Sequence, residues 1–157
     1  MKFDPMHQMF SAAANAAPGR SVPSHAILAA ALTAELAEAV PTAQRRGFYL
    51  AVGRRMAASE TLDGVDDLAQ LAVRVNAFWA AIGWGAADVA IERDAIVVLH
   101  HGAPPPPGDA PAGPWLGMLL AVLEGAYDAW FRRLGSGPTL HTRAEWKGDT
   151  VELRHGR

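Results

Sequence analysis

The sequence contains no cysteine, which excludes disulfides, thiolate metal sites and a cysteine nucleophile. It has almost no net charge, because fourteen basic and sixteen acidic residues leave −2 at pH 7. The basic surplus by which proteins bind nucleic acids is therefore absent. No apolar run approaches the roughly 20 residues that cross a bilayer, and the first residues lack the order of a signal peptide. We expect a cytoplasmic protein, with the periplasm as the alternative, no nucleic-acid partner and no direct membrane insertion.

The 157 residues, half of them apolar, are enough for one domain with a real core. Residues 1–22 are predicted to form a mobile N-terminal arm, because the stretch before Ser21 is alanine-rich and contains Pro18-Gly19. Residues 23–157 are predicted to form a single α+β domain.

Three helices are predicted at the start of this domain. Apolar residues at helical spacing place the first at residues 23–40 and the second at 41–58, with Pro41 as the break between them. The third has a candidate cap at Asp63 and an apolar stripe from Leu68 to Ile82. Gly83 is expected to end it.

The second half of the chain alternates strand and helix signals. A β-hairpin is predicted from residues 89–91 and 96–99, followed by a stiff loop that contains Pro104 to Pro107. A long helix is expected from Pro114 or Trp115 to the residue before Gly135. A second hairpin, residues 139–146 and 150–154, completes an α+β fold with an antiparallel pairing in each hairpin.

The long helix is apolar on more than one face, so we expect it to be covered by the sheet and by another subunit. Leu120, Tyr127 and Trp130 are the residues assigned to that oligomer interface. Arg54 and Arg55 have two interpretations. They either form a solvated face whose stems cover the core, or they lie at a contact between subunits.

No pattern of catalytic or cofactor-binding residues emerges. Phosphate-binding loops, zinc-peptidase motifs and nucleophile elbows are missing. His100 and His101 point to opposite faces of a strand and cannot share a metal. Glu92 and Asp94, which could act as the carboxylate pair of a glycoside hydrolase, flank a turn where solvated acids are expected. We therefore expect a non-enzymatic protein without cofactor or metal.

The five tryptophans leave one candidate for sugar contact. Trp79, Trp115 and Trp130 lie in helical apolar stripes and are expected in the core. Trp84 and Trp146 are freer, and Trp146 lies beside a turn. An exposed aromatic face can stack on a sugar ring, so Trp146 is the candidate for contact with a sugar.

Several segments resemble one protein family. Residues 76–85 read Asn-Ala-Phe-Trp-Ala-Ala-Ile-Gly-Trp-Gly, residues 112–116 read Ala-Gly-Pro-Trp-Leu, and residues 123–127 read Leu-Glu-Gly-Ala-Tyr. With residues 52–57, residues 96–100 and Trp130, they resemble the D subunit of bacterial cellulose synthase in order and spacing. The resemblance covers roughly residues 45–135. Residues 1–22 and the loop at Pro104 to Pro107 depart from the family pattern.

The resemblance implies a non-catalytic accessory subunit. Members of the family are ring-forming homo-octamers, built as tetramers of dimers, whose passages accept nascent β-1,4-glucan chains. They order the export and crystallisation of cellulose, while a separate membrane subunit transfers the sugar. The implied partners are further copies of the chain, β-1,4-glucan chains and other cellulose synthase subunits. The alternative is a cytosolic scaffold that arrays synthase complexes through protein partners without touching glucan.

Overall fold

A computed structural model describes residues 23–157 of the chain, and the predicted arm at residues 1–22 lies outside this range. The described residues form four helices and one four-stranded sheet. In chain order these are α1 (Ser24–Ala39), α2 (Thr42–Ala58), α3 (Leu68–Ile82), β1 (Ala86–Glu92), β2 (Ala95–His101), α4 (Ala112–Arg133), β3 (His141–Lys147) and β4 (Thr150–Gly156). The predicted α+β class and the order of elements are confirmed.

The helix boundaries have local causes. Val40 adopts an extended conformation before Pro41, which separates α1 from α2. Asp67 caps α3 by accepting a hydrogen bond from the Gln70 N–H. The prediction of Asp63 as the cap is wrong, because Gly64, at φ 74°, turns the chain between Asp63 and the helix.

Two hairpins join into a single antiparallel sheet in the order β1-β2-β4-β3. The turn between β1 and β2 contains Arg93 at φ 54°, and the turn between β3 and β4 contains Gly148 at φ 66°. The central β2–β4 pairing joins residues more than fifty positions apart, for example Val98 and Leu153. Both predicted hairpins are confirmed, with their strands one to three residues longer or shifted at the ends.

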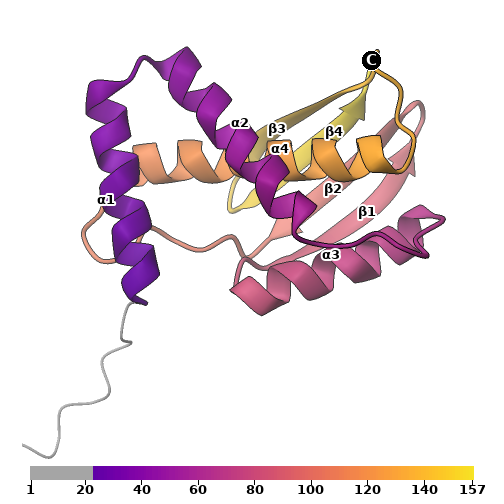
Figure 1. The fold of residues 1–157 in the computed structure, drawn as a ribbon, viewed down its shortest axis with the longest axis horizontal. Helices are drawn as coiled ribbons and strands as arrows, with labels where there is room; N and C mark the ends of the chain where they lie inside the picture. Colours follow the sequence, from indigo (N-terminus) through magenta and orange to yellow (C-terminus); the bar gives the residue numbers. More distant parts are fainter. Residues whose placement is uncertain (1–22) are drawn as a thin grey trace, which may run out of the picture.

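Helix α4 lies at the centre of the molecule, between α2 and the sheet (Figure 1). Every residue from 121 to 127 is buried, so no side of this part of the helix faces solvent. α1 contacts α4 near its beginning, and α3 packs on β1. The helix begins at Ala112, two or three residues before the predicted start. Its large apolar surface is therefore covered by elements of the same chain.

Two glycines allow α2 and α4 to cross at backbone contact. A Cβ on Gly53 of α2 would collide with the carbonyl oxygen of Val122, and one on Gly125 of α4 would collide with that of Leu50. Both glycines belong to the segments that carry the family resemblance. Their role is explained by this crossing, which no larger residue permits.

Gly125→Ala should destabilise the protein by about 1–3 kcal/mol, because the methyl group must push α2 away from α4. Gly117→Ala on the same helix is the control, since a Cβ there meets nothing within 4 Å. That variant should be neutral or stabilise by up to about 1 kcal/mol through helix propensity. Urea unfolding measures both. Equal changes in the free energy of unfolding for the two variants would contradict the close contact between the backbones of α2 and α4.

Candidate functional site

A cluster of four ring side chains, three of them buried and the fourth, Trp84, partly buried, joins α3, β2 and α4. The Trp79 Nε1–H donates to the Tyr127 hydroxyl oxygen at 2.9 Å, and that oxygen lies 3.1 Å from His100 Nδ1. His100 Nε2 lies 2.7 Å from the carbonyl oxygen of Trp84, whose ring stacks on Trp79. Since the Tyr127 oxygen accepts from Trp79, its own hydrogen can go to Nδ1. His100 is then neutral and donates from Nε2 to Trp84.

Burial shifts the pKa values of this cluster toward the neutral forms. It lowers the pKa of His100 from its ordinary 6.5, against a smaller raising effect of the hydrogen bond to Trp84. Burial also raises the pKa of Tyr127, and the hydrogen bond from Trp79 opposes that shift. The cluster holds β2 against the end of α3 as long as His100 is unprotonated.

Other polar side chains of the recognised segments bind backbone groups of the same chain. Asn76 both donates to and accepts from Ala87, at 2.9 and 2.6 Å. The indole N–H of Trp130 donates to the Ala57 carbonyl oxygen at 3.2 Å, and that of Trp115 to Pro104 at 2.8 Å. These residues fix loops and helix ends within one chain, so their role in the fold is structural.

Glu124 is a buried charged residue that sequence reasoning missed. Its carboxylate is buried, accepts from Arg46 Nη2 at 2.6 Å and accepts from the Ala144 N–H at 3.0 Å. It thereby connects α2, α4 and β3. The signal in the sequence is a single acid within an otherwise apolar run of α4. A buried charge needs such partners to be tolerated.

The residues predicted for the oligomer interface do not form one surface. Arg54 and Arg55 are exposed on α2, and neither forms an ion pair within residues 23–157. Leu120 is half-buried against the core. Tyr127 and Trp130 are fully buried inside their own subunit. For these two side chains the interface assignment must be corrected, because the core of the same chain already covers them.

Trp146 is half-buried on β3. It packs against both parts of the core, and its indole N–H donates to the Leu116 carbonyl oxygen at 3.3 Å. It is opposite the buried Val151 in the sheet register, so it belongs to the face that covers α4. Trp79, Trp115 and Trp130 are buried, as predicted.

The two pairs weighed for chemistry remain separate. His100 is buried, while His101 is exposed and lies 3.3 Å from Asp88, which confirms their opposite orientations. Glu92 makes an exposed ion pair with Arg154 at 3.4 Å across the sheet. Over residues 23–157, no group of three or more potential ligands could hold a metal ion.

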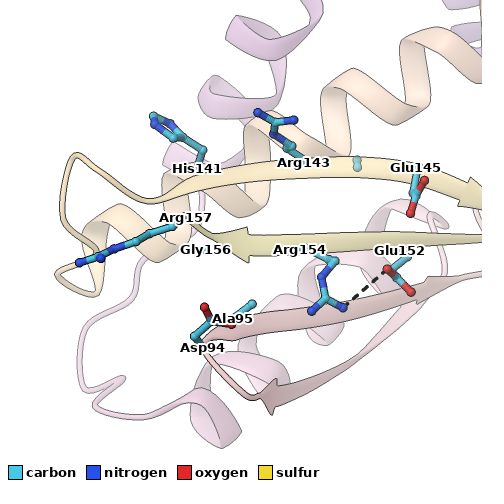
Figure 2. A pocket seen from close by; sticks show the side chains of 10 residues that line it. Asp94, Ala95, His141, Arg143, Glu145, Glu152, Arg154, Gly156 and Arg157 are labelled. Atoms are coloured by element: carbon cyan, nitrogen blue, oxygen red, sulfur yellow. Dashed lines mark ion pairs between the residues drawn. The ribbon is translucent and has the colours of Figure 1, made fainter.

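A hollow of about 690 Å³ lies on the sheet face opposite α4 and is rich in charged groups (Figure 2). Arg143 lies directly opposite Arg154 in the register, and Glu145 lies opposite Glu152. Like charges in that relation repel. Arg154 relieves part of the repulsion by contacting Glu152 at 3.8 Å. No Phe, Tyr or Trp lines the hollow, so it suits weak polar contacts rather than stacking on a large ring.

A second surface, on α1 and α2, has apolar side chains that no other part of residues 23–157 covers. Ile27, Leu28 and Leu32 of α1 are 57, 61 and 56% exposed, and Phe48 of α2 is 54% exposed. We call these four residues the α1–α2 apolar face. α1 has no Asp, Glu, Lys or Arg before Glu35, so nothing charged interrupts it. Sequence reasoning located the surplus apolar surface on α4, whereas the structure leaves apolar side chains exposed on α1 and α2, and singly elsewhere, as at Val73 and Ile91.

Comparison with known families matches residues 11–156 to the family of the cellulose synthase D subunit. The chain belongs to this family. It is also similar to two proteins named cellulose synthase operon protein D, from Komagataeibacter xylinus and Komagataeibacter sucrofermentans. Each is 32% identical over 112 residues, which are 69% of this chain and 69% of the relative. The resemblance in the sequence is thus confirmed, and membership supports a role in cellulose synthesis.

The four helices in the described part of the chain do not include a membrane span. None of them is both long and apolar enough to cross a bilayer. α4 is long enough at 22 residues, but most of its apolar side chains are buried in the core of the subunit.

The buried cluster predicts how stability depends on pH. Because the folded pKa of His100 is below 6.5, the unfolded chain binds more protons, and the free energy of unfolding should fall as pH drops below about 6.5. His100→Gln keeps a donor and an acceptor but cannot titrate. It should reduce this slope, by at most about 1.4 kcal/mol per pH unit. Burial also lowers the pKa of His155, so part of the slope should remain. Urea unfolding from pH 5 to 8 measures it, and an unchanged slope would refute the role of His100.

Proposed function

We propose that this chain is an accessory subunit of bacterial cellulose synthase that assembles into an octameric ring and guides or aligns nascent β-1,4-glucan chains. It takes no part in the sugar transfer itself. The observation that carries the proposal is the α1–α2 apolar face, found in a member of the D-subunit family. A helix that is apolar on all sides belongs in an interior, and large exposed apolar patches mark interaction surfaces.

The apolar face is suited to a copy of itself. In a two-fold dimer the same patch serves both partners. If two α1 helices pack antiparallel, Leu28 of one subunit can lie opposite the partner's Leu32, because the two positions are one turn apart. The same register brings His25 near the partner's Glu35. Both of these residues are exposed.

A ring built from dimers needs a second contact. Glu38 on α1 and Arg54 and Arg55 on α2 are exposed and form no ion pair within the described residues. Opposite charges at the ends of neighbouring helices can join one dimer to the next. We assign the predicted arginine contact to this junction between dimers.

Variants should separate the two contacts. Leu28→Glu combined with Leu32→Glu should give monomers, because each subunit would place charges in an apolar seam. Arg54→Ala combined with Arg55→Ala should stop assembly at dimers. Val73→Glu is the matched control, since Val73 is 73% exposed on α3, outside both contacts. Light scattering coupled to size exclusion measures the masses. An intact octamer in both double variants would refute these assignments.

Guiding a sliding polymer requires weak, distributed contacts rather than a deep pocket. The chain is nearly neutral overall, and glucan is uncharged. The charged hollow on the sheet offers many hydrogen-bonding groups without an aromatic platform. Trp146 lies on the other face of the sheet, which covers α4, and is half-buried there. It is the aromatic side chain that we assign to glucan, at a contact separate from the hollow.

A soluble cello-oligosaccharide should bind the assembled protein weakly, and the affinity should change little with salt, because the ligand is uncharged. Trp146→Ala should weaken the binding, because it removes the indole that stacks on the sugar. An α-1,4-linked oligosaccharide of equal length is the control ligand. Titration calorimetry measures the affinity of the wild-type protein for each sugar and of the Trp146→Ala variant for the cello-oligosaccharide. Failure of the assembled wild-type protein to distinguish the two sugars would overturn the glucan role.

A further inference from the structure

A chain of four polar side chains runs from the end of α4 through the second hairpin. Ser136 Oγ lies 2.6 Å from His155 Nε2, and His155 Nδ1 lies 2.8 Å from Thr142 Oγ1. Thr142 in turn donates to Asp128 Oδ1 at 3.1 Å, and Asp128 Oδ2 accepts from Arg132 at 2.8 Å. His155 and Thr142 are buried, while Ser136 is partly open. The proposed role in cellulose synthesis makes no use of these hydrogen-bonded side chains.

The direction of the hydrogen bonds follows from the number of hydrogens available. The Thr142 hydroxyl has one hydrogen, which goes to Asp128. Its oxygen must therefore accept from His155, so the imidazole carries its hydrogen on Nδ1. His155 Nε2 is then an unprotonated base, and Ser136 donates to it. A hydroxyl held by a basic nitrogen whose other side is fixed by a third group is the arrangement that activates a serine nucleophile.

We propose that Ser136 is a reactive nucleophile that accepts the acyl group of a small uncharged ester, with His155 as its general base. A cavity of about 290 Å³ adjoins both residues. Its apolar wall is formed by Leu68, Ile96, Phe131, Leu134 and Leu140. Asp66 and Asp67 also line it, so anionic acyl donors are repelled. The cavity therefore fits a short, uncharged acyl group.

The reaction balances with water as the only co-reactant. The Ser136 oxygen bonds to the ester carbonyl carbon while its proton moves to His155 Nε2. The bond to the leaving alcohol breaks, and the alcohol takes that proton. Water then attacks the acyl-serine, gives a proton to His155, and the proton returns to the Ser136 oxygen as the carboxylic acid leaves.

We assign the donor for the oxygen that becomes negative to the start of α3. Leu68 is the first residue of α3 and lines the cavity. The N–H groups of a first helical turn have no partner within their helix. Gln70 and Leu71 donate to Asp67, whereas no acceptor for the Leu68 N–H occurs among the described residues. Burial lowers the pKa of His155, which keeps the imidazole available as a base at neutral pH.

The test is covalent labelling of the full-length protein with a fluorophosphonate probe, followed by peptide mass spectrometry. Ser136 should be labelled, and Ser59, exposed at the end of α2 and hydrogen-bonded to the Met56 carbonyl oxygen, should not. Ser136→Ala should abolish the signal. p-Nitrophenyl acetate should release one equivalent of nitrophenol per chain in a burst. Equal labelling of Ser59 and Ser136, or no labelling at all, would overturn the proposal.

Thr142 is a positioning residue, and its variants separate reactivity from folding. Thr142→Val removes the acceptor for His155 Nδ1, so the labelling rate should fall at least tenfold. Thr142→Ser restores the hydroxyl and should recover the rate. His155→Gln should remove labelling while the urea midpoint identifies any loss of fold. Labelling that Thr142→Val leaves unchanged would show that the four residues are only a structural hydrogen-bond chain.

Discussion

The close crossing of α2 over α4 is the constraint on which the rest of the structure depends. Gly53 and Gly125 bring the two helix backbones into contact, which leaves α4 enclosed between α2 and the sheet. Enclosure explains why a 22-residue helix can be apolar on several sides without needing another subunit. It also explains Glu124, whose buried carboxylate connects α2 and β3 at the same level.

Several side chains from the segments that resemble the family therefore stabilise one subunit. Trp79, His100 and Tyr127 form a neutral hydrogen-bonded cluster between α3, β2 and α4. Trp115 and Trp130 fix the polypeptide around α4. The surfaces proposed for assembly and for polysaccharide lie mostly outside these segments, on α1 and on the open sheet face, and Arg54 and Arg55 of α2 are the exception. The fold of the subunit and the proposed contacts therefore depend largely on different residues.

The sequence predicted the order of elements because each has a local signal. Pro41 separates two helices, Gly83 ends a third, and the turn residues define both hairpins. It could not predict how elements share their surfaces. The apolar residues of α4 looked like a subunit contact, since nothing local shows that α2 covers them. Likewise, Ser136 and His155 are 19 positions apart, and only the β3–β4 hairpin brings them together.

The central claim is that α1 and α2, rather than α4, supply the contacts between subunits in a glucan-guiding ring. A cryo-EM reconstruction of the purified protein tests this most directly. The account predicts a closed particle of about eight times 16.7 kDa in which Leu28, Leu32 and Phe48 are covered by neighbouring subunits. A monomer, or a ring in which these three side chains remain open to solvent, would contradict it.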